Sequence, residues 1–129
     1  MASCSGRSYS DLSADADPLT AMQVYDSADN GWLVVGGTSE ASPLAMGSYA
    51  RLLTAHPSLG FAAPWLYQNF LENQNSTSTV NGPPPTQALG GFHDIITGAN
   101  GAYAALPGYD YTTGLGTLDI TVMSAQIGR

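Results

Sequence analysis

The residues best suited to chemistry are two small hydroxyl side chains that follow a pair of glycines. Gly36 and Gly37 precede Thr38 and Ser39. Glycines allow a sharp turn because they lack a Cβ, and a helix that begins just after the turn leaves its first N–H groups without intrahelical partners. These groups, at the positive end of the helix dipole, could stabilise an oxyanion beside an attacking hydroxyl. Ser39 is therefore a candidate nucleophile; the alternative is that Thr38 or Ser39 only caps the helix.

The elements that would position this turn are a strand before it and a helix after it. Residues 32–35 form a short apolar run with β-branched members, which is typical of a buried strand. Pro43 falls near the first helical turn, where a missing N–H costs little, and good helix formers continue to Leu53. The nucleophile elbow of α/β-hydrolases is a different pattern, since it requires a glycine two residues after the serine, where this chain has Ala41.

Around this unit the sequence predicts a hairpin, a second helix, a long loop and a closing helix. Residues 22–25 form a predicted strand, and turn-forming residues link it to the strand at 32–35. Pro64 is well placed at the start of a second helix. Residues 73–91 are rich in Asn, Ser, Thr, Gly and Pro and predict an irregular loop. A short helix is predicted over residues 120–127.

A second chemical site is indicated by Asp94 and Asp110, which flank a stretch rich in glycine and proline. Calcium takes about six to eight oxygen ligands and commonly combines carboxylates with main-chain carbonyls. An irregular loop can turn its carbonyls inward, whereas helices and sheets use theirs in hydrogen bonds. The spacing does not match an EF-hand, and two separated aspartates can equally be solvated loop residues.

The composition narrows the classes of partner. The chain has 129 residues, enough for one domain, and ten acidic residues against three basic ones give it a net charge of −7. So acidic a chain without a basic patch argues against binding to nucleic acid or to an anionic membrane. No apolar run approaches membrane-spanning length, and residues 1–12 lack the apolar core of a signal peptide. Cys4 is the only cysteine, which excludes an internal disulfide, and Asn75 begins a glycosylation sequon.

Three blocks of the sequence, in the right order, resemble the sedolisin (serine-carboxyl) peptidases, a family related to subtilisin. Residues 36–43 read Gly-Gly-Thr-Ser-Glu-Ala-Ser-Pro and resemble the segment around the family's nucleophile. Residues 13–35 are similar to the run that precedes that serine, and residues 92–116 resemble the family's C-terminal calcium loop. The match covers roughly residues 7–120 of this chain, but only the last part of a family catalytic domain.

The resemblance implies an α/β fold of the subtilisin-like, parallel-sheet type. Only its C-terminal portion would be present, made of a hairpin, the serine helix, a second helix and the calcium loop. Residues 1–129 would form a single partial peptidase domain. Within it, residues 1–55 would hold the strand pair and the nucleophile helix, residues 56–91 a helix and the Pro/Asn/Ser-rich loop, and residues 92–129 the calcium loop and the closing helix.

The resemblance also implies a function. Ser39 would be the nucleophile and its N–H an oxyanion donor, while Gly37 and Thr38 would shape the turn and line the substrate cleft. In the family the serine proton is taken by the glutamate of a Glu-x-x-x-Asp pair, which precedes the region that this chain covers. The chain is thus expected to be the C-terminal segment of an acid-acting endopeptidase, inactive alone. Protein or peptide substrates, the missing N-terminal part of the domain as a partner, and an extracellular location are expected with it.

For the calcium site, the resemblance implies carboxylate ligands from Asp94 and Asp110 and main-chain carbonyl ligands from Ile95, Leu106 and Gly108. The family usually has glycine where this chain has Leu106. A backbone ligand survives that change if the turn needs no positive φ. Water would complete the shell of the Ca²⁺ ion.

Other acid–base candidates fit the serine less well. His93 could form a triad with Ser39, but the resemblance places it in the calcium loop. His56 is better explained as a favourable charge at a helix C-terminus. Glu40 is expected to point away from Ser39, because adjacent helix positions face different directions.

Three alternatives to the peptidase segment stay open. A compact enzyme could use Asp15 or Asp17 as a base near the serine, and Asp11 with Asp15 has the spacing of the family's acid pair, although that segment follows the acids in the family. The chain could instead be a non-catalytic calcium-binding module whose serine caps a helix. A truncated product without function is the third.

Overall fold

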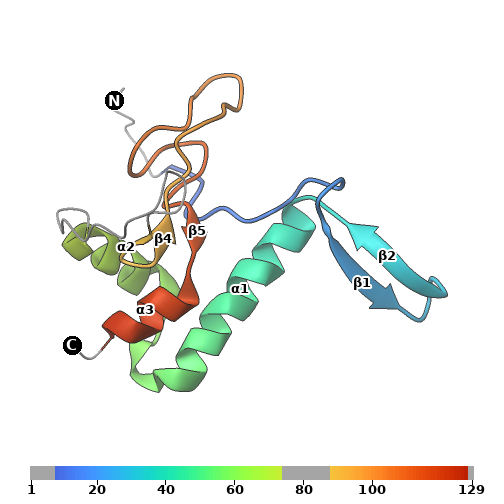
Figure 1. Cartoon of the computed structure of the whole chain (residues 1–129), viewed down its shortest axis with the longest axis horizontal. Coiled ribbons are helices and arrows are strands. Elements are labelled where there is room, and N and C mark those ends of the chain that lie inside the picture. The colour runs from blue at the N-terminus through green and yellow to red at the C-terminus, as the bar shows by residue number, and fades with distance from the viewer. Residues whose placement is uncertain (1–7, 74–87, 128–129) are drawn as a thin grey trace.

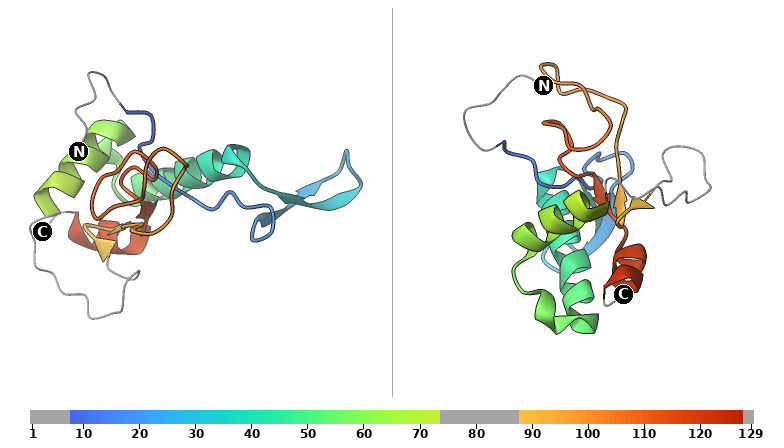
Figure 2. Two further views of the ribbon diagram at one scale, coloured as in Figure 1. Left: turned by 90° about the horizontal axis from the view of Figure 1, so that it is seen from above. Right: turned by 90° about the vertical axis from the view of Figure 1, so that its left-hand side faces the viewer.

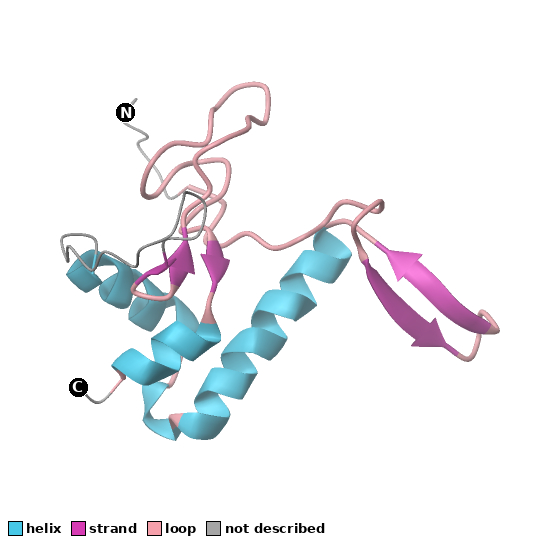
Figure 3. Cartoon of the chain, viewed as in Figure 1, coloured by secondary structure: helices cyan, strands magenta, loops and turns pink. Residues whose placement is uncertain are grey.

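A computed structural model of the chain describes residues 8–73 and 88–127. Its elements follow one another along the chain (Figure 1). They are β1 (Met22–Asp26), β2 (Gly31–Val35), α1 (Thr38–Ala55), a 3₁₀ turn η1 (Pro57–Leu59), α2 (Ala62–Asn73), β3 (Ala88–Leu89), β4 (Phe92–His93), β5 (Thr117–Leu118) and α3 (Ile120–Gln126). The fold is a mixed α/β arrangement in which the helices lie beside a small sheet and a hairpin stands apart (Figure 3).

The predicted hairpin is confirmed. β1 pairs antiparallel with β2, with Met22 opposite Val35 and Tyr25 opposite Trp32. Its turn contains Asn30 at a φ of 64°, a left-handed conformation that asparagine tolerates better than most residues. The hairpin projects from the N-terminal end of α1, away from the other elements, and two views agree on this (Figures 1 and 2).

A second sheet is made of three short antiparallel strands in the order β3-β4-β5. Leu89 pairs with Phe92 across the tight turn at Gly90 and Gly91, and Phe92 pairs on its other side with Leu118. The parallel sheet expected of a subtilisin-like fold has no strand pair among the described residues. Parallel pairing requires a long crossover connection, whereas here β1 and β2, and β3 and β4, are joined by short turns.

The three predicted helices are present, with two differences at the ends. α1 extends to Ala55, and α2 begins at Ala62 rather than at Pro64. The alternative in which Thr38 or Ser39 caps α1 is not observed: the N-cap residue is Gly37, and the helix has no side-chain cap. Gly37 has a φ of 90°, which a serine or threonine would adopt only with strain.

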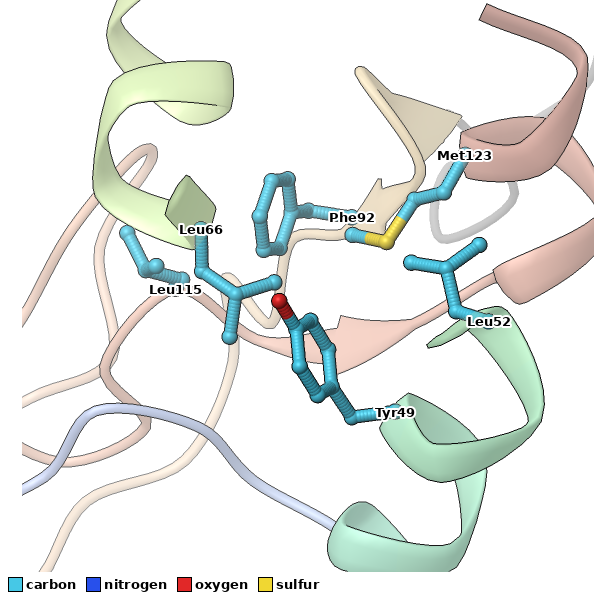
Figure 4. Packing of buried hydrophobic residues seen from close by; sticks show 6 residues of the cluster. All are labelled: Tyr49, Leu52, Leu66, Phe92, Leu115 and Met123. Atoms are coloured by element: carbon cyan, nitrogen blue, oxygen red, sulfur yellow. The ribbon is translucent and has the colours of Figure 1, made fainter. Parts of the chain in front are cut away.

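The core lies where both α1 and α2 meet α3 and the small sheet. Its buried side chains converge on one another (Figure 4) and are Tyr49, Leu52, Leu66, Phe92, Leu115 and Met123. Phe70 of α2 extends the cluster through an edge contact with Phe92, at 5.6 Å between ring centroids. Burial of such a side chain contributes about 1.5–3 kcal/mol, so this cluster holds the helices and the sheet together.

Some expectations fall outside the described part of the chain. Cys4, the sequon at Asn75 and most of the predicted loop lie in segments whose structure is not described; the end of that loop contains the short strand β3. The division at residues 55 and 91 stays a prediction. Within residues 8–73 and 88–127, no helix is long and apolar enough to cross a membrane.

Candidate active site and metal loop

The turn before α1 is fixed by its contacts with an earlier segment of the chain. The N–H of Gly37 donates to the carbonyl of Ala16 at 2.6 Å. A Cβ on Gly36 would lie 2.8 Å from the backbone of Pro18, closer than packed atoms approach one another. Glycine is therefore required at position 36 by space and at position 37 by its positive φ. These constraints set where α1 begins and so where its first serine lies.

Ser39 lies exposed in the first turn of α1. The N–H groups of Glu40 and Ala41 donate to the Gly37 carbonyl, at 3.0 and 3.2 Å. Among the described residues, the N–H groups of Thr38 and Ser39 have no acceptor and the Ser39 hydroxyl makes no hydrogen bond. A free hydroxyl next to free N–H groups at a helix N-terminus is an arrangement that suits a nucleophile with an oxyanion donor.

Glu40, the next residue, has a structural contact that the sequence did not reveal. Its side chain is only 6% exposed, and Oε1 accepts a hydrogen bond from the N–H of Met22 at 2.7 Å. Oε2 is buried and has no partner in the described structure. Glu40 therefore joins the start of the hairpin to the first turn of α1. Its hydrogen bond is to Met22, in keeping with the expectation that it is not the base of Ser39.

The acids considered as an alternative base are engaged elsewhere. Asp15 Oδ1 accepts from the N–H of Asp17 and from the Thr20 hydroxyl, at 3.1 and 3.0 Å. Asp11 Oδ1 accepts from the Tyr67 hydroxyl at 2.6 Å. Their segment contacts the glycine turn, yet within the described residues no carboxylate bonds to the serine hydroxyl. The serine thus lacks a hydrogen-bonded base in this structure.

Neither histidine reaches the serine. His93 of β4 lies 3.3 Å from Asp119 Oδ2, so it is paired at the start of α3. His56 is the C-cap residue of α1, as its predicted place at a helix end requires, and its ring lies 2.8 Å from the Ser124 hydroxyl. A Ser39–His93 triad is not formed, because β4 and the N-terminus of α1 lie in different parts of the molecule (Figure 1).

The structure brings together the residues predicted to form a calcium loop. Asp94 follows β4, and its Oδ2 accepts from the N–H of Gly108 at 2.6 Å. Asp110 is only 5% exposed, and its Oδ2 accepts from the N–H of Leu106 at 3.0 Å. Four of the five predicted ligand residues are therefore joined by these two bonds, and Ile95 adjoins Asp94 in the chain.

The two carboxyl groups have opposite electrostatic environments. Burial raises the pKa of Asp94, and the nearby charge of Asp110 raises it further, although the Gly108 N–H opposes both. Burial also acts to raise the pKa of Asp110, but hydrogen bonds from the N–H groups of Leu106, Thr113 and Thr112 outweigh it and leave that pKa lowered. Two neighbouring carboxylates that repel each other form a place where a cation is stabilised.

The donor set is compatible with a hard cation in two respects. The carbonyls of Ile95, Leu106 and Gly108 accept no hydrogen bond in the described structure, and so are free to serve as ligands. Leu106 does not have a positive φ, since Asn30 is the one non-glycine residue with that conformation in the described ranges. No group of three or more His, Cys, Asp or Glu side chains gathers in these ranges, but Ca²⁺ accepts a mixture of few carboxylates and several carbonyls.

Two features of this loop were missed at the level of sequence. Thr113 supports Asp110 through its N–H at 2.8 Å and its hydroxyl at 3.0 Å. An aspartate followed by hydroxyl residues two and three positions later is a known local turn pattern and could have indicated these bonds. The loop also lines an open hollow of about 200 Å³, whose lining includes Tyr103, Tyr109 and Tyr111. No local pattern predicts this hollow, because it depends on how the loop folds back.

Known proteins resemble this chain over most of its length. No family profile matches the chain. Sedolisin from Pseudomonas sp. (strain 101) is 37% identical over 122 residues, which are 91% of this chain and 18% of sedolisin. Xanthomonalisin from Xanthomonas sp. (strain T-22) is 40% identical over 91 residues, 67% of this chain and 9% of its own length. Kumamolisin from Bacillus sp. (strain MN-32) is 34% identical over 120 residues, 88% of this chain and 18% of its own length.

The same relationship holds in three dimensions. Pseudomonas sedolisin, a serine-carboxyl proteinase solved with two molecules of pseudo-iodotyrostatin, superposes with a TM-score of 0.70 at 35% identity, over 89% of this chain and 28% of that one. The chain belongs to the sedolisin family. It spans less than a fifth of the length of the curated relatives it matches.

Proposed function

We propose that this chain is the C-terminal segment of a subtilisin-like, sedolisin-type catalytic domain and carries the nucleophile of a serine-carboxyl endopeptidase. The observation that carries the proposal is the state of Ser39. It is exposed in the first turn of α1, its hydroxyl is unbonded, and its N–H is free among the described residues. A serine that only caps a helix uses its hydroxyl to accept from a backbone N–H, and here no such bond is present.

The proposed reaction is acyl transfer. The Ser39 oxygen attacks the carbonyl carbon of a peptide bond, and its proton passes to a general base. The carbonyl oxygen becomes an oxyanion that accepts from the Ser39 N–H. The leaving amine departs with a proton, and water then hydrolyses the ester on Ser39. Gly37 and Thr38 shape the turn and line the cleft in which the substrate chain lies.

The base is a carboxylate supplied by the rest of the catalytic domain, in keeping with the family's glutamate. Carboxylic acids act as base and acid in one reaction only where their protonation states are mixed, which places activity in acid. Because the described residues offer Ser39 no bonded carboxylate, the chain alone is inactive. Loss of one member of a catalytic set removes most of the rate enhancement.

The loop from Asp94 to Asp110 would hold Ca²⁺ through these two carboxylates and the carbonyls of Ile95, Leu106 and Gly108. When bound, the ion would neutralise the repulsion between the carboxylates and stabilise the loop. The two aspartates would remain ionised beside it. Both carboxylates are already held in place, Asp110 by the N–H groups of Thr112 and Thr113 and Asp94 by the N–H of Gly108.

Protein or peptide substrates and an extracellular location belong to the same proposal, because they are properties of the family. The remainder of the catalytic domain is the proposed partner. The acidic balance of the chain, with a net charge of −7, continues to argue against nucleic acid or an anionic membrane.

The proposal is tested by cleavage of a denatured protein at mildly acidic pH with calcium. We expect no cleavage by the chain alone. Cleavage should appear when the part of the Pseudomonas sedolisin chain that has no counterpart here is added as a separate polypeptide. Ser39→Ala should abolish it, whereas Ser42→Ala, which removes another exposed hydroxyl from the start of the same helix, should not.

Two results would contradict the proposal. Cleavage by the chain alone that Ser39→Ala abolishes would show that the chain holds its own base, with Asp15 and Asp17 as the first candidates. A complex that forms with the added polypeptide but cleaves nothing would show that Ser39 is not a nucleophile.

A further inference from the structure

The loop between β4 and β5, which projects beyond the small sheet (Figure 1), contains a hollow with aromatic walls. Tyr103, Tyr109 and Tyr111 form these walls, and the lining is mainly apolar. Asp110 is the one charged member of its described lining. The volume is about 200 Å³, whereas pockets for drug-sized ligands measure about 300–1,000 Å³. A hollow of this size therefore suits a single small chemical group.

The hollow is distinct from the predicted calcium site, although both lie in the same loop. Asp94, Ile95 and Gly108 are not among the described residues that line the hollow, whereas Leu106 and Asp110 border both places. The proposed calcium ligands are oxygen atoms, but the walls of the hollow are aromatic rings. The two places therefore suit different ligands.

The geometry of the rings is that of a cage. Tyr111 is nearly perpendicular to Tyr103, at 84° and 5.1 Å between ring centroids, and to Tyr109, at 79° and 6.4 Å. Rings at such angles form walls on different sides of the space that they line. The face of an aromatic ring is electron-rich, and a cation within about 6 Å of the ring centroid is attracted to it.

The walls are held in place before any ligand binds. Tyr103 is 50% exposed, yet its N–H donates to Asn100 Oδ1 at 2.9 Å and its carbonyl accepts from the Thr112 hydroxyl at 3.0 Å. The Tyr109 hydroxyl donates to the carbonyl of Ser10 at 3.1 Å. A preformed site loses less entropy on binding than one that must be ordered by its ligand.

Asp110 gives the hollow a negative charge. Burial acts against ionisation, but N–H groups of Leu106, Thr113 and Thr112 leave the pKa of Asp110 lowered. Residues 94–118 contain no Lys, Arg or His, so the loop has no cation of its own to offset the charge. Both oxygens of Asp110 already accept hydrogen bonds. A Lys ammonium group, with three N–H donors, would find few acceptors here, whereas a quaternary ammonium group has no N–H and requires only charge and contact.

We propose that this hollow binds a quaternary ammonium group, which lies between the tyrosine rings and faces the charge of Asp110. The ring faces supply cation–π attraction and apolar contact for the N-methyl groups, as in the aromatic cages that recognise choline and methylated lysine. The site is independent of Ser39 and of the missing base, because the loop alone forms it.

The probe for this site is choline, compared with dimethylbutanol, its uncharged analogue in which carbon replaces the nitrogen. Each is titrated into the full chain with a chelator present, because Ca²⁺ beside Asp110 would offset its charge. The amide NMR signals of residues 102–111 report binding. We expect these signals to shift with choline, and choline to bind at least about fivefold more tightly than the analogue, since only choline gains the cation–π attraction.

Variants of Tyr103 test the cage itself. Tyr103→Leu keeps an apolar side chain but removes the ring, and should weaken choline binding about fivefold. Tyr103→Phe keeps the ring and should bind choline as the unmutated chain does. Tyr25→Leu is the matched control: Tyr25 is 61% exposed and in edge contact with an aromatic ring, like Tyr103, but it lies in β1. Circular dichroism would show that each variant is folded.

Three results would overturn the inference. They are equal affinities for choline and its uncharged analogue, unchanged choline binding by Tyr103→Leu, and the absence of choline-dependent shifts in residues 102–111. None of these measurements involves Ser39 or peptide cleavage. A failure here would therefore leave the proposed peptidase function as it stands, and a failure of Ser39-dependent cleavage would leave the ammonium site.

Discussion

The two ends of α1 differ in what surrounds them. Near the C-terminal end, Tyr49 and Leu52 are buried against α2, α3 and the small sheet. Near the N-terminal end, Ser39 is exposed and Met46, still in the first half of the helix, is 70% exposed. One continuous helix thus joins an exposed N-terminal end to a packed part of the chain, called the body below, in which the C-terminal end of α1 meets α2, α3 and the small sheet. The candidate nucleophile lies at the exposed end, where packing within this chain does not determine the structure.

This difference implies that the residues that determine stability are not those proposed to carry the function. The body contains the buried cluster and the loop at Asp94 and Asp110, so its residues should govern unfolding of the isolated chain. The hairpin and the first turn of α1 are positioned by the close packing at Gly36 and by the hydrogen bonds of Gly37 with Ala16 and of Glu40 with Met22. Variants in the body should therefore lower the free energy of unfolding of the chain strongly, and variants in the hairpin should change it little.

The largest effect is expected from Gly116→Ala in the body. Gly116 has a φ of 85°, and a Cβ there would overlap the backbone carbonyl of His93. Backbone strain costs about 1–3 kcal/mol and overpacking about as much again, so we expect the free energy of unfolding to fall by about 4 kcal/mol. Urea denaturation followed by circular dichroism would measure it.

The matched control is Gly47→Ala in the exposed part of α1. Nothing lies within 4 Å of a Cβ at Gly47, and alanine is favoured over glycine in a helix by about 0.5–1 kcal/mol. The control should therefore stabilise the chain slightly. If Gly116→Ala were as harmless as Gly47→Ala, the close approach of Gly116 to the carbonyl of His93 would not be as described.

A smaller loss is expected from Met123→Ala, which empties the centre of the core. Met123 is fully buried on α3 and contacts the turn at Gly91. Removing a large buried side chain costs about 2–5 kcal/mol, and we expect about 3 kcal/mol for Met123. Thermal unfolding would show this as a lower midpoint. A midpoint equal to that of the unmutated chain would mean that the body is not held by this cluster.

Much of the fold could be predicted from local patterns. Strand and turn residues before Val35 predicted the hairpin, and the helix formers from Leu44 to Leu53 predicted α1. Both predictions were possible because these elements depend on residues close together in the chain. A cap by Thr38 or Ser39 was suggested by their own propensity, whereas Gly37 is the N-cap residue because the turn needs its positive φ. That turn is bonded to Ala16, a partner distant in sequence.

The candidate site could also be predicted only in part. The sequence indicated Ser39, Asp94 and Asp110 as site residues, but it did not indicate which residues surround them. The Glu40–Met22 bond and the pairing of His93 with Asp119 arise from the folding of separate segments onto one another. No local pattern contains such contacts. Resemblance to a family supplied the ligand roles, and spacing alone left the two aspartates indistinguishable from solvated loop residues.

The third prediction concerns Asp94 and Asp110 in the chain without calcium. The pKa of Asp94 is raised in the folded chain, so its stabilising effect is present at low pH and is lost as pH rises through that pKa. The pKa of Asp110 is lowered, so its effect is present above its ordinary pKa and is lost as pH falls. At pH 7 Asp110→Asn should cost about 2 kcal/mol, because it disrupts bonds to a buried carboxylate, whereas Asp94→Asn should raise stability.

Calcium should reverse the result for Asp94. At a hundredfold excess over its Kd, a bound ion stabilises the unmutated chain by about 2.7 kcal/mol, and either substitution should remove that gain. Thermal unfolding with calcium and with a chelator measures both states. Equal midpoints with and without calcium in the unmutated chain would show that this loop is not a calcium site.

The smallest effect in the isolated chain is expected from Trp32→Ser, and it gives the sharpest contrast with Met123. Trp32 is 69% exposed, and its ring is in edge contact with that of Tyr25 across the hairpin. Such a cross-strand pair contributes about 0.2–1 kcal/mol, so the free energy of unfolding should change by less than about 1 kcal/mol. A loss as large as that of Met123→Ala would place the hairpin inside the body's cooperative unit.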